Sequence, residues 1–183
     1  MDFCHIAPTP HLSVTDGRPV HLVLAHLIEE DEDYVNYYLQ QKEKYGCMII
    51  MDNSAFEMYK QNRPMYDSSK LITMGARINA DYIVLSDYPD SDPENTIEAA
   101  MVMAPVIKEE GFGTFFVPQG NKGSIDDLLY AFKFAATVRR SPSPLNGYTI
   151  CCSHEGKKYI LPTSGLNTTA CVGFSLSLLF TAL

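Results

Sequence analysis

The sequence predicts an α/β protein built on a parallel sheet. Short apolar segments alternate with longer amphipathic ones at intervals of about 30 residues, the size of one strand-helix-strand unit. Almost wholly apolar segments such as Cys47–Met51 are typical of strands that are buried on both faces. With 183 residues, 46% of them hydrophobic, the chain has enough apolar material for one core. We therefore expect a single domain over residues 1–183.

Five segments are expected to form strands, because they are rich in aliphatic and β-branched residues and end at polar or turn residues. They are residues 21–26, 47–51, 81–86, 114–117 and 147–152. The preceding residues 1–20 contain three prolines and a glycine, and predict an irregular lead-in.

Four helices are expected between these strands. The first begins in the acidic run 29–33 and ends at Gly46, because acidic residues favour a helix N-terminus and glycine favours its C-terminal end. The others cover about 67–76, 93–110 and 124–137. Asp92 is a candidate N-cap for the helix at 93–110. Pro105 lies inside this helix and predicts a kink or an early break. Residues 161–183 show neither the helix period nor the strand period in their apolar residues and form an atypical C-terminal segment.

The composition narrows the classes of function. A formal net charge of -8 has the wrong sign for a protein that holds nucleic acid by general phosphate neutralisation, so such a contact must be local or supplied by a partner. The five cysteines include no CxxC pair, which favours a reducing compartment. We find no signal peptide pattern and no apolar run of about 18 residues. The sequence thus predicts a cytoplasmic protein with no membrane span.

Polar side chains follow each expected strand. In parallel α/β sheets, ligands bind at the carboxyl ends of the strands, so these residues are expected to share one edge. Taken singly, Asp52 is also a plausible helix N-cap and Asp87 a plausible turn residue. Taken together, they predict a site. The candidates at the strand ends are His26, Asp52, Asp87, Gln119 and the group 153–155.

The residue types at these ends suit chemistry on a planar base attached to a sugar. The chain has no phosphate-binding glycine loop, so no nucleotide cofactor is expected. Paired carboxylates suit reactions at an anomeric carbon, where one transfers a proton and the other stabilises positive charge. The Gln119 amide both donates and accepts, and Phe56 offers a stacking face. A metal site built from the histidines and carboxylates is a minority alternative, since no metal-binding motif is present.

Three segments resemble the tRNA-guanine transglycosylases. MDNSAFE at 51–57 is similar to their DSGGFQ-type segment, LSDYPD at 85–90 to the segment of a second base-reading aspartate, and VPQG at 117–120 to a glutamine-glycine segment. The segments also follow in the family's order. With the IAP lead-in and the LVLAH strand, the chain most resembles the phage and bacterial 7-deazaguanine DNA ribosyltransferases. The resemblance covers roughly the first 150 residues.

This resemblance implies a (β/α) barrel of the TIM type. Because a complete barrel usually needs about 250 residues, we expect a shortened or incomplete barrel of about five to six units, with an open doubly wound sheet as the alternative. The implied activity exchanges guanine for a 7-deazaguanine such as 7-cyano-7-deazaguanine in DNA, without a cofactor or metal. The implied partners are DNA, ahead of tRNA, and the free base. A homo- or hetero-oligomer is also expected, and the location is the host cytoplasm for a phage protein.

By position, Asp52 corresponds to the acid/base group of the family. The base-binding candidates are Asn53, Phe56, Asp87, Gln119, Gly120 and His26. The chain departs from the family at Ser54 and Ala55, which replace a glycine pair, and at Glu57, which replaces a glutamine. Two further features of the family have no matching segment in this chain. They are the covalent aspartate, which the family carries on a later strand, and the family's zinc site. Two alternatives therefore stay open: a non-catalytic base-binding or accessory subunit, and a metal-assisted aldolase or isomerase.

Overall fold

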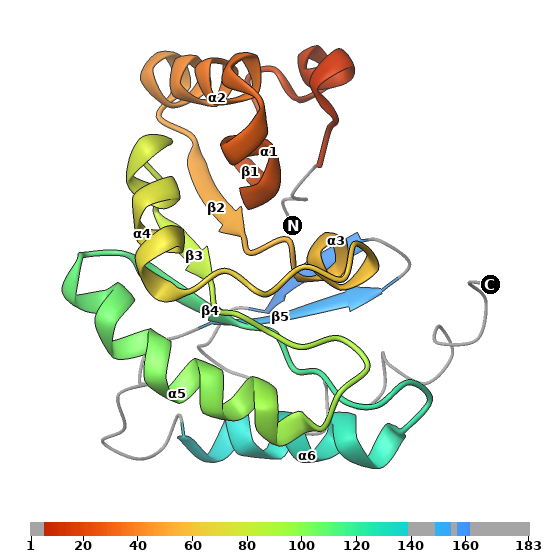
Figure 1. The fold of residues 1–183 in the computed structure, drawn as a ribbon. Coiled ribbons are helices and arrows are strands. Elements are labelled where there is room, and N and C mark those ends of the chain that lie inside the picture. The colour runs from red at the N-terminus through yellow and green to blue at the C-terminus, as the bar shows by residue number, and fades with distance from the viewer. Residues whose placement is uncertain (1–5, 139–148, 155–156, 162–183) are drawn as a thin grey trace.

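The computed structural model describes residues 6–138, 149–154 and 157–161, which form one six-stranded sheet with the strands in sequence order (Figure 1). The first five strands pair in parallel, and the sixth pairs antiparallel with the fifth. The strands are β1 Val20–Leu24, β2 Met48–Asp52, β3 Tyr82–Val84, β4 Gly113–Phe116, β5 Thr149–His154 and β6 Lys157–Leu161.

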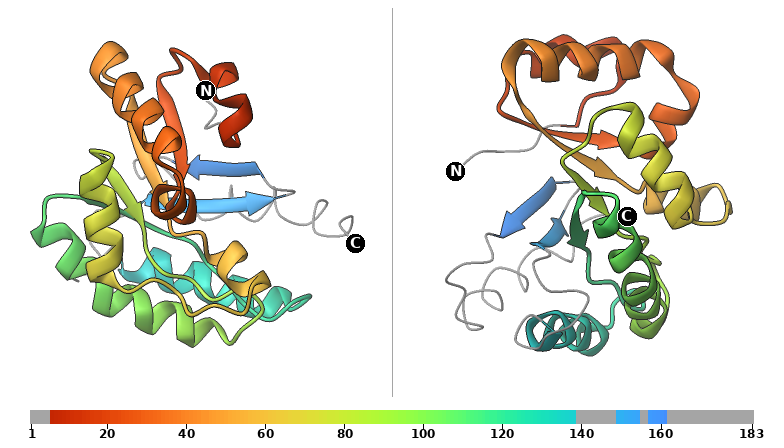
Figure 2. Two further views of the ribbon diagram at one scale, coloured as in Figure 1. Left: turned by 45° about the horizontal axis from the view of Figure 1, so that its top comes forward. Right: turned by 90° about the vertical axis from the view of Figure 1, so that its left-hand side faces the viewer.

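Helices connect the parallel strands. They are the 3-10 helix η1 Thr9–Thr15, α1 Ala25–Glu30, α2 Glu32–Tyr45, α3 Ala55–Lys60, α4 Ser68–Arg77, α5 Pro93–Glu109 and α6 Ile125–Val138. The long helices α2, α4, α5 and α6 surround one side of the curved sheet (Figures 1 and 2). The prediction of an α/β protein with a parallel sheet is confirmed.

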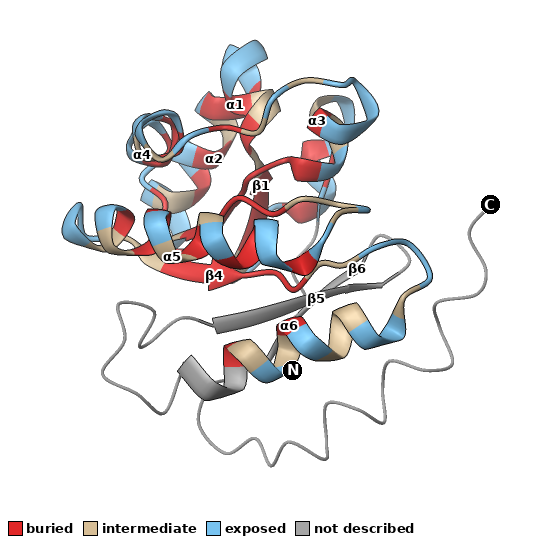
Figure 3. Ribbon diagram, turned by 60° about the horizontal axis from the view of Figure 1, so that its bottom comes forward, coloured by how far each residue is buried: buried red, intermediate tan, exposed pale blue. Residues whose placement is uncertain are grey.

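The two faces of the sheet have separate apolar clusters. On the helix side, strand residues such as Ile49 and Ile83 pack with helix residues such as Tyr38 and Leu71 in the larger cluster. The opposite face contributes a smaller cluster with members from four neighbouring strands: Leu22, Ile50, Val84, Phe115 and Val117. Buried residues accordingly follow the strands and the inward faces of the helices (Figure 3). Because the strand order follows the chain from β1 to β5, the described part of the sheet is wound in one direction and lacks the reversal of a doubly wound sheet.

The strand register brings the carboxyl ends of β1 to β4 to one edge. Leu24 pairs with Asp52, Met51 with Ile83, and Val84 with Phe115. The segments that leave β2, β3 and β4 therefore start beside one another. This edge carries the residues that the sequence singled out.

The structure corrects the first strand and the first helix. The strand ends at Leu24 instead of residue 26, so His26 lies in α1. The single helix expected from residue 29 to Gly46 is divided at Asp31, whose extended backbone separates α1 from α2. The Asp31 carboxylate accepts the Tyr34 N–H at 3.1 Å and so caps α2, which places the cap inside the acidic run. Gly46 ends α2 in the left-handed conformation, as expected.

Other boundaries also differ from expectation. The lead-in contains the 3-10 helix η1, which begins after Pro8 with a proline in its first turn. The third strand is shorter than predicted, since β3 covers Tyr82–Val84. The α5 helix continues past Pro105 to Glu109, so no early break occurs. Ala104 and Ile107, on either side of the proline, are fully buried, and their packing holds this part of the helix on the sheet. Asp92 caps α5 as predicted.

The fifth strand is displaced and a sixth was missed. β5 covers Thr149–His154 instead of 147–152, and β6 forms from Lys157–Leu161. The sequence pattern predicted no strand at these residues, because an adjacent charged pair such as Lys157 and Lys158 is typical of solvated surface. Most of the segment 161–183 lies outside the described residues.

Candidate functional site

The turn between β2 and α3 is buried, although its residues are polar. Asp52, Asn53 and Ser54 are each at most 3% exposed. Ser54 adopts the left-handed conformation, with φ 58° and ψ 32°, at the point where the strand becomes the helix. This conformation favours glycine and costs other residues about 1 kcal/mol or more. The strand thus delivers three polar side chains into the protein through a strained turn.

Two side-chain amides meet the Asp87 carboxylate. Asn53 Nδ2 donates to Asp87 Oδ1 at 2.5 Å and also to the Leu85 carbonyl at 2.5 Å. Gln119 Nε2 donates to the other oxygen, Asp87 Oδ2. Asp87 is 4% exposed. Hydrogen bonds to a charged carboxylate are strong in a buried environment, because the local dielectric constant is low. The structure therefore joins three of the predicted residues, from the ends of β2, β3 and β4, in one polar cluster.

The segment that carries Gln119 is fixed against α6. The Asn121 side chain and backbone both donate to Asp127 Oδ2, at 2.7 and 3.1 Å. A Cβ atom on Gly120 would lie 2.5 Å from Asp127 Cβ, so this close approach requires glycine. Gly120 thus allows the segment that carries Gln119 to pack against α6. Within the described residues, it makes no hydrogen bond to the Asn53, Asp87 and Gln119 cluster. The Asp127 anchor was not identified from the sequence.

Asp52 ends β2 beside this cluster. It is 3% exposed and precedes Asn53 directly, so the second buried carboxylate of the described residues belongs to the same edge. Burial raises the pKa of Tyr34 to about 12, and the Asp52 carboxylate contributes to this rise. The Tyr34 hydroxyl accepts the Leu24 N–H at 3.1 Å and stays a neutral phenol near Asp52. The alternative that Asp52 is the N-cap of a helix is wrong, because Ser54 occupies that position.

His26 reaches the same turn from α1. Its Nδ1 lies 2.9 Å from Ser54 Oγ, and its backbone N–H donates to the same oxygen at 3.2 Å. The structure therefore places His26 beside the turn, but through Ser54 and from a helix instead of a strand end. The sequence identified His26 as a candidate and gave no sign of its bond to Ser54.

Phe56 lies on the outside of α3. The residue is 54% exposed, and Lys60 Nζ lies 4.3 Å from its ring centroid. One turn of helix away, the Tyr59 hydroxyl donates to Asp90 Oδ2, while Asp90 Oδ1 accepts the Lys122 N–H. Asp90 thus ties together the segments that follow β2, β3 and β4. Phe56 is at the rim of this edge and takes no part in the buried cluster.

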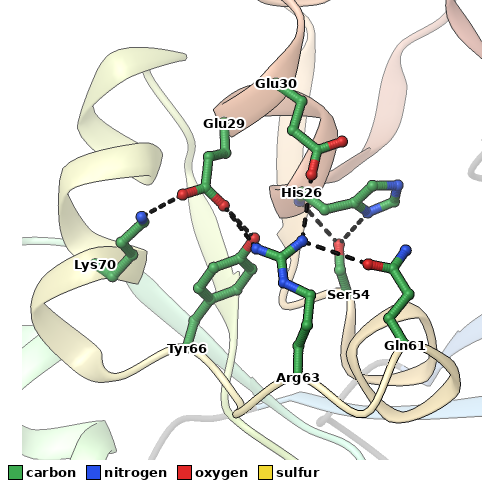
Figure 4. A network of polar contacts seen from close by, with 8 residues as sticks. All are labelled: His26, Glu29, Glu30, Ser54, Gln61, Arg63, Tyr66 and Lys70. Carbon is green, nitrogen blue, oxygen red and sulfur yellow. Dashed lines mark hydrogen bonds and ion pairs between the residues drawn. The ribbon is translucent and has the colours of Figure 1, made fainter.

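A charged network secures the segment between α3 and α4 against α1 (Figure 4). Glu29 accepts bonds from Lys70 and from the Tyr66 hydroxyl, the latter at 2.6 Å, and pairs with Arg63. Arg63 also contacts Glu30. Hydrogen bonds from Lys70 and Tyr66 lower the pKa of Glu29 below its ordinary value. The network thus fixes the segment that follows α3 against α1, the helix that carries His26.

Replacing Glu29 by glutamine is expected to flatten the acid side of the stability profile. Because the pKa of Glu29 is lower in the folded state, its stabilisation is complete above the unfolded value and is lost as the pH falls through the folded value. Solvent screens such a half-exposed pair, so the loss at neutral pH should be about 1 kcal/mol or less. Urea unfolding at a series of pH values measures this loss. The free energy of unfolding of Glu29→Gln should approach that of the parent protein at low pH. Glu109→Gln, an exposed change, is the control, and an unchanged Glu29→Gln profile would contradict this role.

Two open pockets lie near the sheet without containing the cluster. One, of about 560 Å³, is at the opposite edge, beside Lys42 and Asp81. The other, of about 720 Å³, lies between α4 and α5 and includes Ser86, Tyr88 and Asn95. Ser86 directly precedes Asp87, so this second pocket adjoins the cluster from the helix side. Within the cluster, both oxygens of the Asp87 carboxylate accept amide N–H groups, so a ligand that binds Asp87 competes with Asn53 and Gln119.

Metal and membrane signals were sought over the same described residues. Within 6–138, 149–154 and 157–161, no group of three or more His, Cys, Asp or Glu side chains could hold a metal ion. In that part of the chain no helix combines the length and the apolar character needed to cross a bilayer. Ser153 and His154 end β5, while the third member of that predicted group, Glu155, lies outside the described residues.

Comparison with known proteins gives no assignment: no family model matches the chain, and no curated protein matches it.

Proposed function

We propose that the chain binds a guanine-type base at the Asn53, Asp87 and Gln119 cluster and exchanges guanine for a 7-deazaguanine in DNA. The observation that carries the proposal is the meeting of one buried carboxylate and two amides at the carboxyl ends of three adjacent strands. The three segments that resemble the transglycosylases contribute one member each. A shortened (β/α) barrel is the architecture implied, and the singly wound sheet supports it.

The donors and acceptors of the cluster complement a guanine edge. Guanine presents two neighbouring N–H donors and a carbonyl oxygen, and a carboxylate accepts both donors. In the structure, the amides of Asn53 and Gln119 both donate to the Asp87 carboxylate. A guanine-type base replaces them at Asp87, and the Gln119 amide is then available for the carbonyl oxygen. Adenine offers a donor beside an acceptor and fits this arrangement poorly.

Asp52 is proposed as the acid/base group of the exchange. It is a buried carboxylate at the end of β2, on the edge of the sheet that carries the cluster. At this position it transfers the proton that the departing or entering base needs. Phe56, exposed at the rim, is proposed to stack on a base or nucleotide that enters from solvent.

The backbone at Ser54 adds independent support. This residue occupies the first position of the glycine pair in the DSGGFQ-type segment, and its φ of 58° is the conformation that glycine favours. The turn geometry that the family's glycine permits is therefore present in this chain, with serine in the strained position.

A base-binding or accessory subunit is the second candidate. Asp52 and Asp87 are the buried carboxylates of the described residues, and the resemblance assigns the covalent aspartate to a later strand. This set of carboxylates would fit a subunit that provides the base pocket and pairs with another subunit that provides the nucleophile. The net charge of -8 favours the same division, because the partner would then supply the positive surface for the polynucleotide.

Incubation with labelled 7-cyano-7-deazaguanine and guanine-containing DNA or tRNA tests the proposal. We expect label to enter DNA, with less or none entering tRNA. Base binding without incorporation into either polymer would favour the accessory subunit. Neither binding nor incorporation would refute both candidates.

A further inference from the structure

Ser54 occupies a backbone position that works against it. A serine at φ 58° is strained, whereas glycine at the same position would not be. Strain of this kind in a buried turn is retained where the side chain has a use. Among the residues that the structure describes, the hydrogen bonds of the Ser54 side chain are both with His26, so its use concerns that histidine.

The hydrogen-bond inventory at Ser54 determines which way the bond to His26 runs. The hydroxyl oxygen already accepts the His26 backbone N–H, at 3.2 Å. The hydroxyl hydrogen needs an acceptor, because Ser54 is 0% exposed and an unpaired buried donor is costly. His26 Nδ1, at 2.9 Å, is the acceptor that its described contacts provide. The hydroxyl therefore donates to Nδ1, which leaves the ring proton of neutral His26 on Nε2.

We infer that Ser54 is a positioning residue that holds His26 as an Nε2–H donor toward an oxygen of the sugar-phosphate backbone of the substrate. His26 is half-buried, and its ring nitrogen that does not contact Ser54 points away from that residue (Figure 4). Along the edge, His26 contacts Ser54, whereas Asp87 and Gln119 lie on the side of Asn53. With the base at Asp87, the sugar and phosphate are the groups left for His26.

This inference rests on the proposed function for the identity of the oxygen, but the state of His26 is measurable without any ligand. Nitrogen-15 NMR of the neutral ring in the unliganded protein distinguishes the two tautomers. We expect Nε2–H in the parent protein and a tautomer mixture in Ser54→Gly. Glycine is the suitable replacement because it removes the hydroxyl and accepts the left-handed backbone. Asn62→Gly, at an exposed residue with φ 53°, is the matched backbone control. Nδ1–H in the parent protein would overturn the inference.

Binding of two probes locates the acceptor. For a guanine-containing single-stranded oligodeoxynucleotide, Ser54→Gly and His26→Ala are expected to weaken binding roughly three- to tenfold, the effect of one lost hydrogen bond. Binding of free 7-cyano-7-deazaguanine should be unchanged, and His26→Gln, which places an N–H near the position of Nε2, should recover part of the loss. His11→Ala, at an exposed histidine, is the control.

The outcomes separate the two ideas. Free base bound normally, with oligonucleotide binding unaffected by both variants, would overturn the role of His26 and leave the base site standing. Failure of the parent protein both to bind the free base and to incorporate it would refute the proposed function, while the tautomer measurement would still decide the positioning role of Ser54.

Discussion

Replacing Asp52 by asparagine is expected to lower the rate of base exchange by about 10²- to 10⁴-fold, the usual contribution of a positioned acid/base group. Asparagine has nearly the same shape, so the buried turn at 3% exposure should be preserved. Binding of the free base, which depends on Asp87 and its amides, should remain. The measurement is incorporation of labelled 7-cyano-7-deazaguanine into DNA, together with a binding titration of the same protein.

The control for this variant is Asp126→Asn, because Asp126 is an exposed carboxylate in the first turn of α6. It should exchange bases at the parent rate. Exchange by Asp52→Asn at the parent rate would remove Asp52 from the chemistry. Loss of base binding together with exchange would instead make Asp52 part of the binding cluster.

Replacing Asp87 by asparagine is expected to weaken binding of the free base roughly 10- to 100-fold, the effect of removing hydrogen bonds to a charged acceptor. The new amide also brings N–H groups against those of Asn53 and Gln119, which both donate to this carboxylate in the parent protein. The free energy of unfolding should therefore fall by about 1–3 kcal/mol, since buried donors lose their acceptor. Calorimetric titration measures the binding, and urea denaturation measures the stability.

Gln119→Glu provides a second test of the same cluster. It sets a carboxylate against the Asp87 carboxylate and should weaken base binding in the same direction. Asp126→Asn again serves as the control. Parent-like binding by Asp87→Asn and Gln119→Glu would show that the base is held elsewhere.

Several features of the fold were predictable because their causes are local. The apolar run before Asp52 and the glycine that ends α2 follow from patterns within a few residues. The meeting of Asp87 with Gln119 was also predictable, because parallel strands deliver their carboxyl ends to one edge. The division of α1 from α2 was not, because it depends on Asp31 capping from within an acidic run where several residues qualify as caps.

The finer geometry of the site depends on contacts between distant segments. Serine itself does not favour the left-handed backbone found at Ser54, and the position's match to a glycine of the DSGGFQ-type segment was interpreted only as a loss of backbone freedom. The bond from Asn53 to Asp87 joins residues 34 positions apart, and its formation depends on the register of β2 and β3. The exposure of Phe56 follows from the orientation of α3, a short helix that the sequence pattern does not define. These features required the folded structure.

The most direct test of the central claim follows the side-chain amide signals of Asn53 and Gln119 by proton-nitrogen NMR as 7-cyano-7-deazaguanine is added. A base bound at the cluster should shift both signals along one saturable curve. The amide signal of Asn95, which lines the pocket between α4 and α5, should stay in place. Saturable shifts at Asn95 with Asn53 and Gln119 unmoved, or no shift at any of the three, would contradict the claim that this cluster is the base-binding site.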